Sequence, residues 1–221
     1  MLKVHHLENS RSQRLLWLLE ELSLEYELQL YRRDPKTQLA PPEMRKIHPL
    51  GKSPLLEDDG VVYAETGAII EHVLEKHGQG RLQATDDEGR RRQRFWLHYA
   101  EGSLMPLLLL KLIFTKIESG PMPFFIKPIA KGIVQKVDAA FTGPQSKLHF
   151  DFVEAELGRS TWLAGAELTA ADIQMSFPLE AAASRFGHGG QYPNIRAFVE
   201  RVHAREAYRR ALERGGPYAY A

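Results

Sequence analysis

The 221-residue sequence contains no cysteine. This absence excludes a disulfide framework, a Cys-x-x-Cys redox pair, a thiolate zinc site and a sulfur nucleophile supplied by the protein. If thiol chemistry occurs here, the thiol arrives with a substrate. The sequence also lacks an excess of either charge, because 29 basic residues stand against 28 acidic ones. We therefore expect no nucleic-acid partner, since no overall positive field would attract a polyanion.

Long apolar runs are also missing. The most apolar stretch, residues 104–117, contains Pro106 and Lys111 and is shorter than the roughly 18 apolar residues of a membrane-spanning helix. We expect Leu104, Leu107 and Leu108 within it to belong to a buried core, and the lining of an apolar pocket is the alternative. The first residues lack the cationic start and apolar centre of a signal peptide. These features predict no membrane span and a cytoplasmic location.

The first 80 residues combine strand and helix patterns and predict a small α/β domain. Alternating residues predict strands, leucines at helical spacing predict a helix from Arg14, and Asp58-Asp59-Gly60 predicts a hairpin turn. The expected strands are Leu2–Leu7, Tyr26–Tyr31 and Val61–Ala64, and the other expected helices are 41–47 and Thr66–His77.

The polar residues 78–87 predict a linker, and no convincing strand follows it. We expect an all-helical domain over residues 88–221, with helices at 88–117 (interrupted at Pro106), 124–141, 146–157, 169–186 and 194–214. At the start of one of them, Thr169 and Asp172 form a variant of the capping box, which favours a helix start and implies no catalytic role.

Three short segments are candidate binding sites. Ser53-Pro54 favours a cis peptide bond, which would leave the Ser53 backbone free to pair with a peptide-like ligand, while Lys52 could bind a carboxylate. Glu65 and Thr66 stand where a strand leads into a helix, whose free N–H groups suit a carboxylate, and Glu65 could pair with an ammonium group. An ordinary turn and an ordinary helix cap are the respective alternatives.

The third segment comprises residues 9–12, at the end of the first strand. Its amide and hydroxyl groups at a helix N-terminus suit an anion such as a thiolate, and simple capping is the alternative. The nine histidines predict no metal site. His5 and His6 face opposite ways on a strand, and His72 and His77 are not at adjacent helical spacing.

Taken together and in this order, these segments resemble the glutathione transferase superfamily, most closely a group of fungal and bacterial members. The resemblance covers essentially the whole chain and is carried by the segments 5–22, 31–60, 63–77, 168–173 and 192–202. It implies a thioredoxin-like domain over residues 1–80 and an all-helical domain over residues 88–221. The helical domain would receive the second substrate and form a homodimer.

The resemblance also implies roles for residues. Pro54 would be the cis-proline, the Ser53 backbone would pair with the cysteinyl part of glutathione, and Lys52 would contact its glycyl end. Glu65 and Thr66 would hold the γ-glutamyl group. The thiol-activating position falls on Asn9, with Ser10 beside it. Ser10 is the predicted hydroxyl donor to the thiolate, and Asn9 is the competing candidate.

The implied activity is detoxifying conjugation of the glutathione thiolate, with glutathione as co-substrate, to a small hydrophobic electrophile. The loop lacks the tyrosine that many relatives use there. This departure keeps two alternatives open: a glutathione-dependent disulfide reductase, and a non-catalytic protein that binds glutathione or a hydrophobic ligand.

Overall fold

The N-terminal part of the chain forms a four-stranded mixed sheet. The structure is a computed structural model that describes residues 1–186 and 191–220. The strands β1 (Leu2–Leu7), β2 (Tyr26–Tyr31), β3 (Leu55–Asp58) and β4 (Val61–Ala64) lie in the order β2-β1-β3-β4. β1 runs parallel to β2, and β3 is antiparallel to both β1 and β4. The predicted strands over these residues are confirmed.

Helices α1 (Gln13–Glu21), α2 (Met44–Ile47) and α3 (Thr66–His77) accompany the sheet. α1 is buried on nearly every side, and Leu15, Leu16, Trp17, Leu18 and Leu19 have no exposed surface. This burial arises because α1 contacts the sheet on one side and the helical part, through α8 and α10, on the other. The order of these strands and helices is the one predicted for the thioredoxin-like unit.

From residue 87 onward, the described elements are all helical. They are α4 (Asp87–Tyr99), the π-helix η1 (Ala100–Leu104), α5 (Met105–Ser119), α6 (Lys127–Val137), the π-helix η2 (Asp138–Thr142), α7 (Gly143–Leu157), α8 (Ala170–Phe186), α9 (Pro193–His203) and α10 (Glu206–Gly215). No helix among the described residues is both long and apolar enough to cross a membrane.

Several helix boundaries differ from the predictions, and α2 and α7 each begin three residues away from the expected start. The expected interruption of the helix over 88–117 is present, since α4 ends at Tyr99, the π-helix η1 follows, and α5 begins at Met105 with Pro106 in its first turn, where the missing N–H costs little. The helix expected to start at residue 124 begins at Lys127 and continues through η2 into α7. The helix expected over 194–214 is two helices, since Arg205 has extended backbone angles and separates α9 from α10.

The two parts share one hydrophobic core. Its buried side chains come from β1, α1 and α3 as well as from α4, α8, α9 and α10. α10 returns across the chain to pack on α1, and the buried ring of His6 bonds through Nε2 to the carbonyl of Gly215 at 3.1 Å. Leu104, Leu107 and Leu108 are buried as expected.

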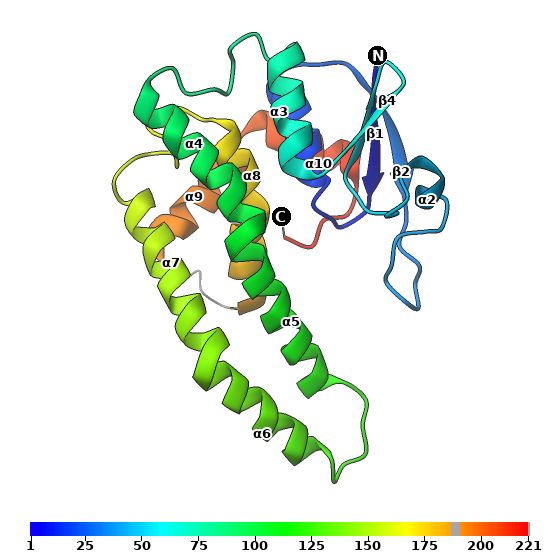
Figure 1. Ribbon diagram of the computed structural model, residues 1–221, viewed down its shortest axis with the longest axis vertical. Helices are drawn as coiled ribbons and strands as arrows, with labels where there is room; N and C mark the ends of the chain where they lie inside the picture. Colours follow the sequence, from blue (N-terminus) through cyan, green and yellow to red (C-terminus); the bar gives the residue numbers. More distant parts are fainter. Residues whose placement is uncertain (187–190, 221) are drawn as a thin grey trace.

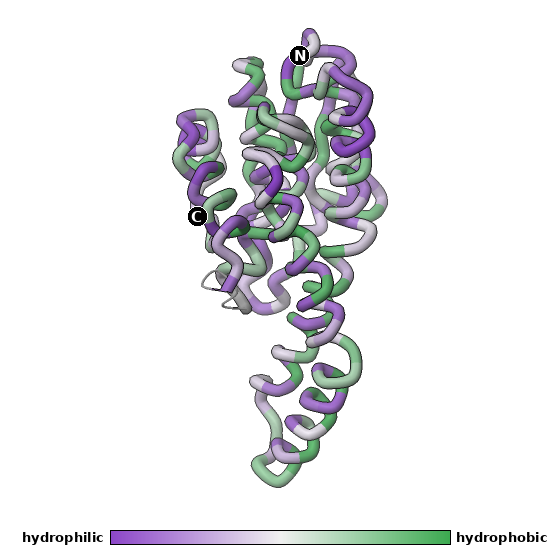
Figure 2. Tube along the Cα trace, turned by 90° about the vertical axis from the view of Figure 1, so that its left-hand side faces the viewer, coloured by the Kyte–Doolittle hydropathy of each residue, from purple (hydrophilic) through white to green (hydrophobic). Residues whose placement is uncertain are grey.

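α5 and α6 form a hairpin that projects away from the rest of the molecule (Figure 1). Hydrophobic residues lie along it (Figure 2). Several of these side chains are exposed to solvent, namely Leu109, Ile113, Ile117, Phe124, Phe125, Ile126, Ile129 and Ile133.

Candidate functional site

The Ser53–Pro54 peptide bond is cis, as the sequence predicts. It lies directly before the first residue of β3, beside the C-terminal end of the neighbouring strand β1. The Ser53 hydroxyl accepts a hydrogen bond from the Leu7 backbone N–H at 3.3 Å, which fixes this turn against β1. The Ser53 backbone N–H and C=O bond to no backbone group of the described residues. They are therefore available to an extended, peptide-like ligand.

Glu65 and Thr66 occupy the start of α3. Glu65 has φ 70°, a region that costs a non-glycine residue about 1–3 kcal/mol and is concentrated at functional sites. Its carboxylate makes no hydrogen bond or ion pair within the described chain. No side chain caps α3, so the N–H groups of its first turn remain free for an anion.

These residues line one cavity of about 260 Å³. It brings together the five predicted glutathione-binding residues, Lys52, Ser53, Pro54, Glu65 and Thr66. Its other lining residues are Arg11, His48, Leu50, Leu55, Ala64 and Glu101. The cavity contains the cationic Lys52, the free carboxylate of Glu65 and the free N–H groups at the start of α3. This combination suits a zwitterionic, peptide-like molecule.

The buried side chain of Arg14 holds two residues that line this cavity, Thr66 and Glu101. Only 1% exposed, it donates from Nη2 to Glu101 Oε1 at 2.6 Å and to Thr66 Oγ1 at 3.3 Å. Its Nη1 donates to the carbonyl of Gln174 in α8 at 2.6 Å. One guanidinium thus connects α1, the start of α3, η1 and α8.

Neither Asn9 nor Ser10 lines this cavity. The Ser10 hydroxyl is buried and lies 2.8 Å from Ser12 Oγ, which in turn lies 2.7 Å from His6 Nδ1 and 3.2 Å from the carbonyl of Leu7. Asn9 is exposed, has φ 49°, and accepts the Ala219 N–H at its Oδ1 at 3.1 Å. Its amide N–H₂ bonds to none of the described residues, so Asn9 has free donors and Ser10 does not.

Comparison with known proteins decides which family this arrangement represents. Residues 10–76 match the model for the glutathione S-transferase N-terminal domain, and residues 123–206 match that for the C-terminal domain. Glutathione S-transferase 1 of Saccharomyces cerevisiae is 39% identical over 223 residues, covering 97% of this chain and 95% of that protein. This chain belongs to the glutathione S-transferase family.

Other relatives agree with this assignment. Glutathione S-transferase 3 of Schizosaccharomyces pombe is 35% identical over 215 residues, covering 97% of this chain and 88% of that protein. The crystal structure of a glutathione S-transferase from Actinobacillus pleuropneumoniae is 33% identical, with a TM-score of 0.83, and covers 99% of this chain and 94% of its own. The protein is therefore a glutathione transferase, with glutathione as its co-substrate.

The predicted capping box of this transferase is present at the start of α8. Asp172, which has no exposed surface, accepts the backbone N–H of Thr169 at Oδ2 and that of Leu163 at Oδ1, both at 2.8 Å. The Thr169 hydroxyl accepts the Ala171 N–H at 3.3 Å. Asp172 thereby ties the loop before α8 to the helix start and does not line the cavity at Ser53.

Six lining residues were not predicted as glutathione contacts, and Arg11, His48 and Glu101 are the polar ones among them. Arg11 belongs to the candidate segment 9–12, and His48 precedes Lys52 in the segment that leads to the cis-proline, so their position in the sequence was the only signal for them. Glu101 lies in η1, and no local pattern indicated that this turn of helix reaches across to α3. π-helical turns are frequent at functional sites, and here the turn presents Glu101 to both Arg11 and Arg14.

Proposed function

We propose that the cavity at Ser53 binds reduced glutathione. The γ-glutamyl ammonium pairs with Glu65, its carboxylate bonds to Thr66 and the free N–H groups of α3, and Lys52 meets the glycyl carboxylate. The cysteinyl backbone pairs with Ser53, whose turn depends on the cis-Pro54. The observation that carries this proposal is that all five residues, from two separate sequence segments, line a single cavity.

In this arrangement the thiol lies toward the start of α1, in the loop of residues 9–12. We propose that the Asn9 amide donates to the thiolate there, because its N–H₂ is free, and that buried Ser10 holds the loop in shape. The thiolate attacks a small hydrophobic electrophile: a carbon–sulfur bond forms, the leaving group departs with its electron pair, and the thiol proton passes to water. The helical residues 88–221 supply the second-substrate site, and detoxification is the expected role.

Removing the thiolate donor should raise the pKa of bound glutathione. An Asn9→Gly variant deletes the amide while tolerating the positive φ, so its bound thiol should titrate closer to the ordinary value of about 8.5. Ser10→Ala should leave the titration near that of wild type. Ultraviolet absorbance of the bound thiolate against pH measures both. A raised pKa in Ser10→Ala alone would reassign the donor to Ser10.

The occupied hydroxyl of Ser10 favours a second candidate reaction, glutathione-dependent disulfide reduction. Without a free hydroxyl in the loop, the thiolate is stabilised by fewer donors and is a better nucleophile toward sulfur. Parallel assays with an aryl halide and with a small mixed disulfide separate the reactions. Faster turnover of the aryl halide supports conjugation, and turnover of the disulfide alone supports reduction.

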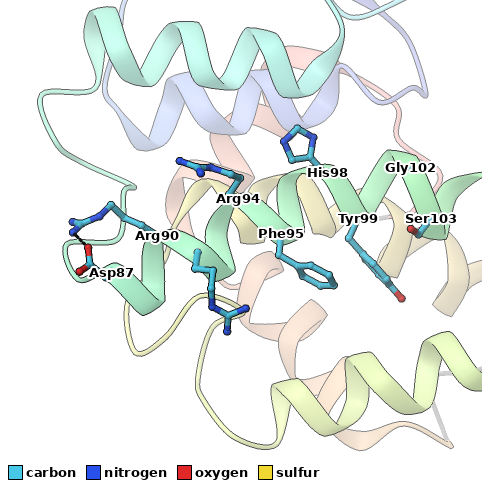
Figure 3. A pocket seen from close by; sticks show the side chains of 9 residues that line it. Asp87, Arg90, Arg94, Phe95, His98, Tyr99, Gly102 and Ser103 are labelled. Atoms are coloured by element: carbon cyan, nitrogen blue, oxygen red, sulfur yellow. Dashed lines mark hydrogen bonds and ion pairs between the residues drawn. The ribbon is translucent and has the colours of Figure 1, made fainter.

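We further propose a homodimer that uses the outer face of α4. Figure 3 shows Arg90, Arg94, Phe95, His98 and Tyr99 on this face, where they line a cavity of about 780 Å³. Phe95 is 43% exposed and contacts Phe152 of α7, which is also exposed, so an apolar strip lies between charged groups. Light scattering should give twice the chain mass, whereas the mass of one chain would contradict the dimer. A cytoplasmic location stays a prediction from the sequence.

A further inference from the structure

Two histidines and an aspartate converge at the end of the sheet farthest from Ser53. Asp58 is the last residue of β3, and His72 and His77 belong to α3. Although five positions separate the histidines, about 140° around a helix, their Nε2 atoms lie 2.9 and 2.8 Å from the same oxygen, Asp58 Oδ2. The spacing of the two histidines in the sequence did not indicate that they approach each other, because the residue that both contact, Asp58, lies on β3 and not on α3.

The Asp58 carboxylate is only partly satisfied. It is 2% exposed, and its second oxygen, Oδ1, has no hydrogen-bond partner. Three donors instead crowd around Oδ2: the two histidine nitrogens and Lys76 Nζ at 2.9 Å. A buried carboxylate oxygen without a partner is unusual in a protein and is often explained by a bound ion or water.

The two imidazole rings are held toward this point. Tyr63 stacks on His72 with ring centroids 3.8 Å apart and planes inclined by 19°. The His77 ring stands nearly perpendicular to that of His72, at 83°. The histidine side chains are 17% and 24% exposed, so an ion and a water can reach the cluster from solvent.

The geometry and donor chemistry fit a tetrahedral zinc ion. The three ligand atoms lie within 4.8 Å of one another. Bonds of about 2.0–2.1 Å in a tetrahedron place neighbouring ligand atoms about 3.3 Å apart, so small side-chain movements suffice. We propose that Asp58, His72 and His77 form a divalent transition-metal site, with zinc as the fitting ion and a water in the fourth position.

Lys76 is the group that competes with the metal. Its Nζ contacts Asp58 Oδ2 at 2.9 Å and also Asp59 Oδ2 at 2.8 Å. When an ion binds, Lys76 gives up Asp58 but keeps Asp59, so its charge stays paired. Removing the lysine charge should therefore strengthen metal binding.

The site has a structural rather than a chemical consequence. It joins the β3–β4 hairpin to the C-terminal end of α3, whereas Thr66 at the other end of that helix faces the glutathione cavity. The glutathione reaction requires no metal, so this site is separate from it. An ion that binds only the folded protein raises its melting temperature.

The test is titration of the untagged, full-length protein with Co²⁺, followed by its visible absorption, and with Zn²⁺, followed by calorimetry. We expect one ion per chain, a tetrahedral cobalt spectrum and a higher melting temperature. His72→Ala and His77→Ala should each lose roughly tenfold or more in affinity. Glu75→Gln, which removes an exposed carboxylate of α3 outside the cluster, should bind as wild type does.

The Lys76→Met variant is a second test that changes neither histidine. This variant should bind Zn²⁺ more tightly than wild type, because Lys76 no longer competes for Asp58. Circular dichroism of each variant confirms that the fold is retained. No saturable Co²⁺ or Zn²⁺ binding by the wild type would overturn the proposal and leave the cluster as an ion-pair network. Binding that persists unchanged in both folded histidine variants would overturn it too.

Discussion

Replacing Asp172 with alanine is expected to lower the free energy of unfolding by about 3–5 kcal/mol. The substitution leaves the buried N–H groups of Leu163 and Thr169 without an acceptor, at roughly 1–3 kcal/mol each. Thr169→Ala is the matched control, because it removes the two bonds of the Thr169 hydroxyl, to the Ala171 N–H and to Asp172 Oδ2, but leaves Asp172 as the acceptor of both backbone N–H groups, and it should cost about 1 kcal/mol. Thermal unfolding followed by circular dichroism measures both. Equal losses in the two variants would contradict this role of Asp172.

The carboxyl group of Asp172 also makes the stability of the folded protein depend on pH. Burial raises the pKa of Asp172 to about 6 from an ordinary 3.8. Between about pH 4 and 6 the folded protein therefore holds a proton that the unfolded chain releases, so this group's contribution to stability falls as pH rises through that window. Asp172→Asn cannot titrate. The difference in melting temperature between wild type and Asp172→Asn should consequently shrink from about pH 4 to pH 6.

Replacing Arg14 with alanine should be nearly as damaging, at about 3–5 kcal/mol, a loss of roughly 10 °C in melting temperature. The buried guanidinium bonds to groups of η1, α3 and α8, and its removal leaves the carbonyl of Gln174 unpaired and a void beside α1. Arg14→Lys should not rescue it, because one ammonium cannot reproduce the planar fork.

Because Arg14 also holds Thr66 and Glu101, folded Arg14 variants should bind glutathione more weakly. Arg91→Ala is the control: its ion pair with Glu88 is exposed, with side chains 70% and 59% accessible, and its loss should leave the melting temperature close to that of wild type. A melting temperature of Arg14→Ala within about 2 °C of wild type would contradict a structural role for this residue.

Local patterns were sufficient for the first 77 residues. Strand alternation, leucine spacing and the Asp58-Asp59-Gly60 turn are short-range signals, and each predicted element there is present. Local reasoning failed where a distant partner decides the structure. The break at Arg205 carries no proline or glycine and arises because α9 and α10 pack on different neighbours.

The residues of the candidate site also fall into those that local sequence patterns indicate and those that depend on packing between distant elements. Lys52, Ser53, Pro54, Glu65 and Thr66 were found because each motif has a local backbone reason: a cis bond or a helix start. Glu101 and the meeting of Asp58 with His72 and His77 depend on packing between elements, which a single sequence does not display. Whether the hydroxyl of Ser10 is free also depends on packing, since Ser12 and His6 settle it.

The measurement that tests the central claim most directly is a calorimetric titration with reduced glutathione of wild type, Glu65→Gln and Glu71→Gln. The two variants remove one exposed carboxylate each, at the start and in the middle of α3. We expect saturable binding by wild type and Glu71→Gln, and a loss of about tenfold or more in Glu65→Gln, because a charged partner of the ammonium is gone. Wild-type protein that shows no binding up to millimolar glutathione, or Glu65→Gln that binds as tightly as wild type, would contradict the account.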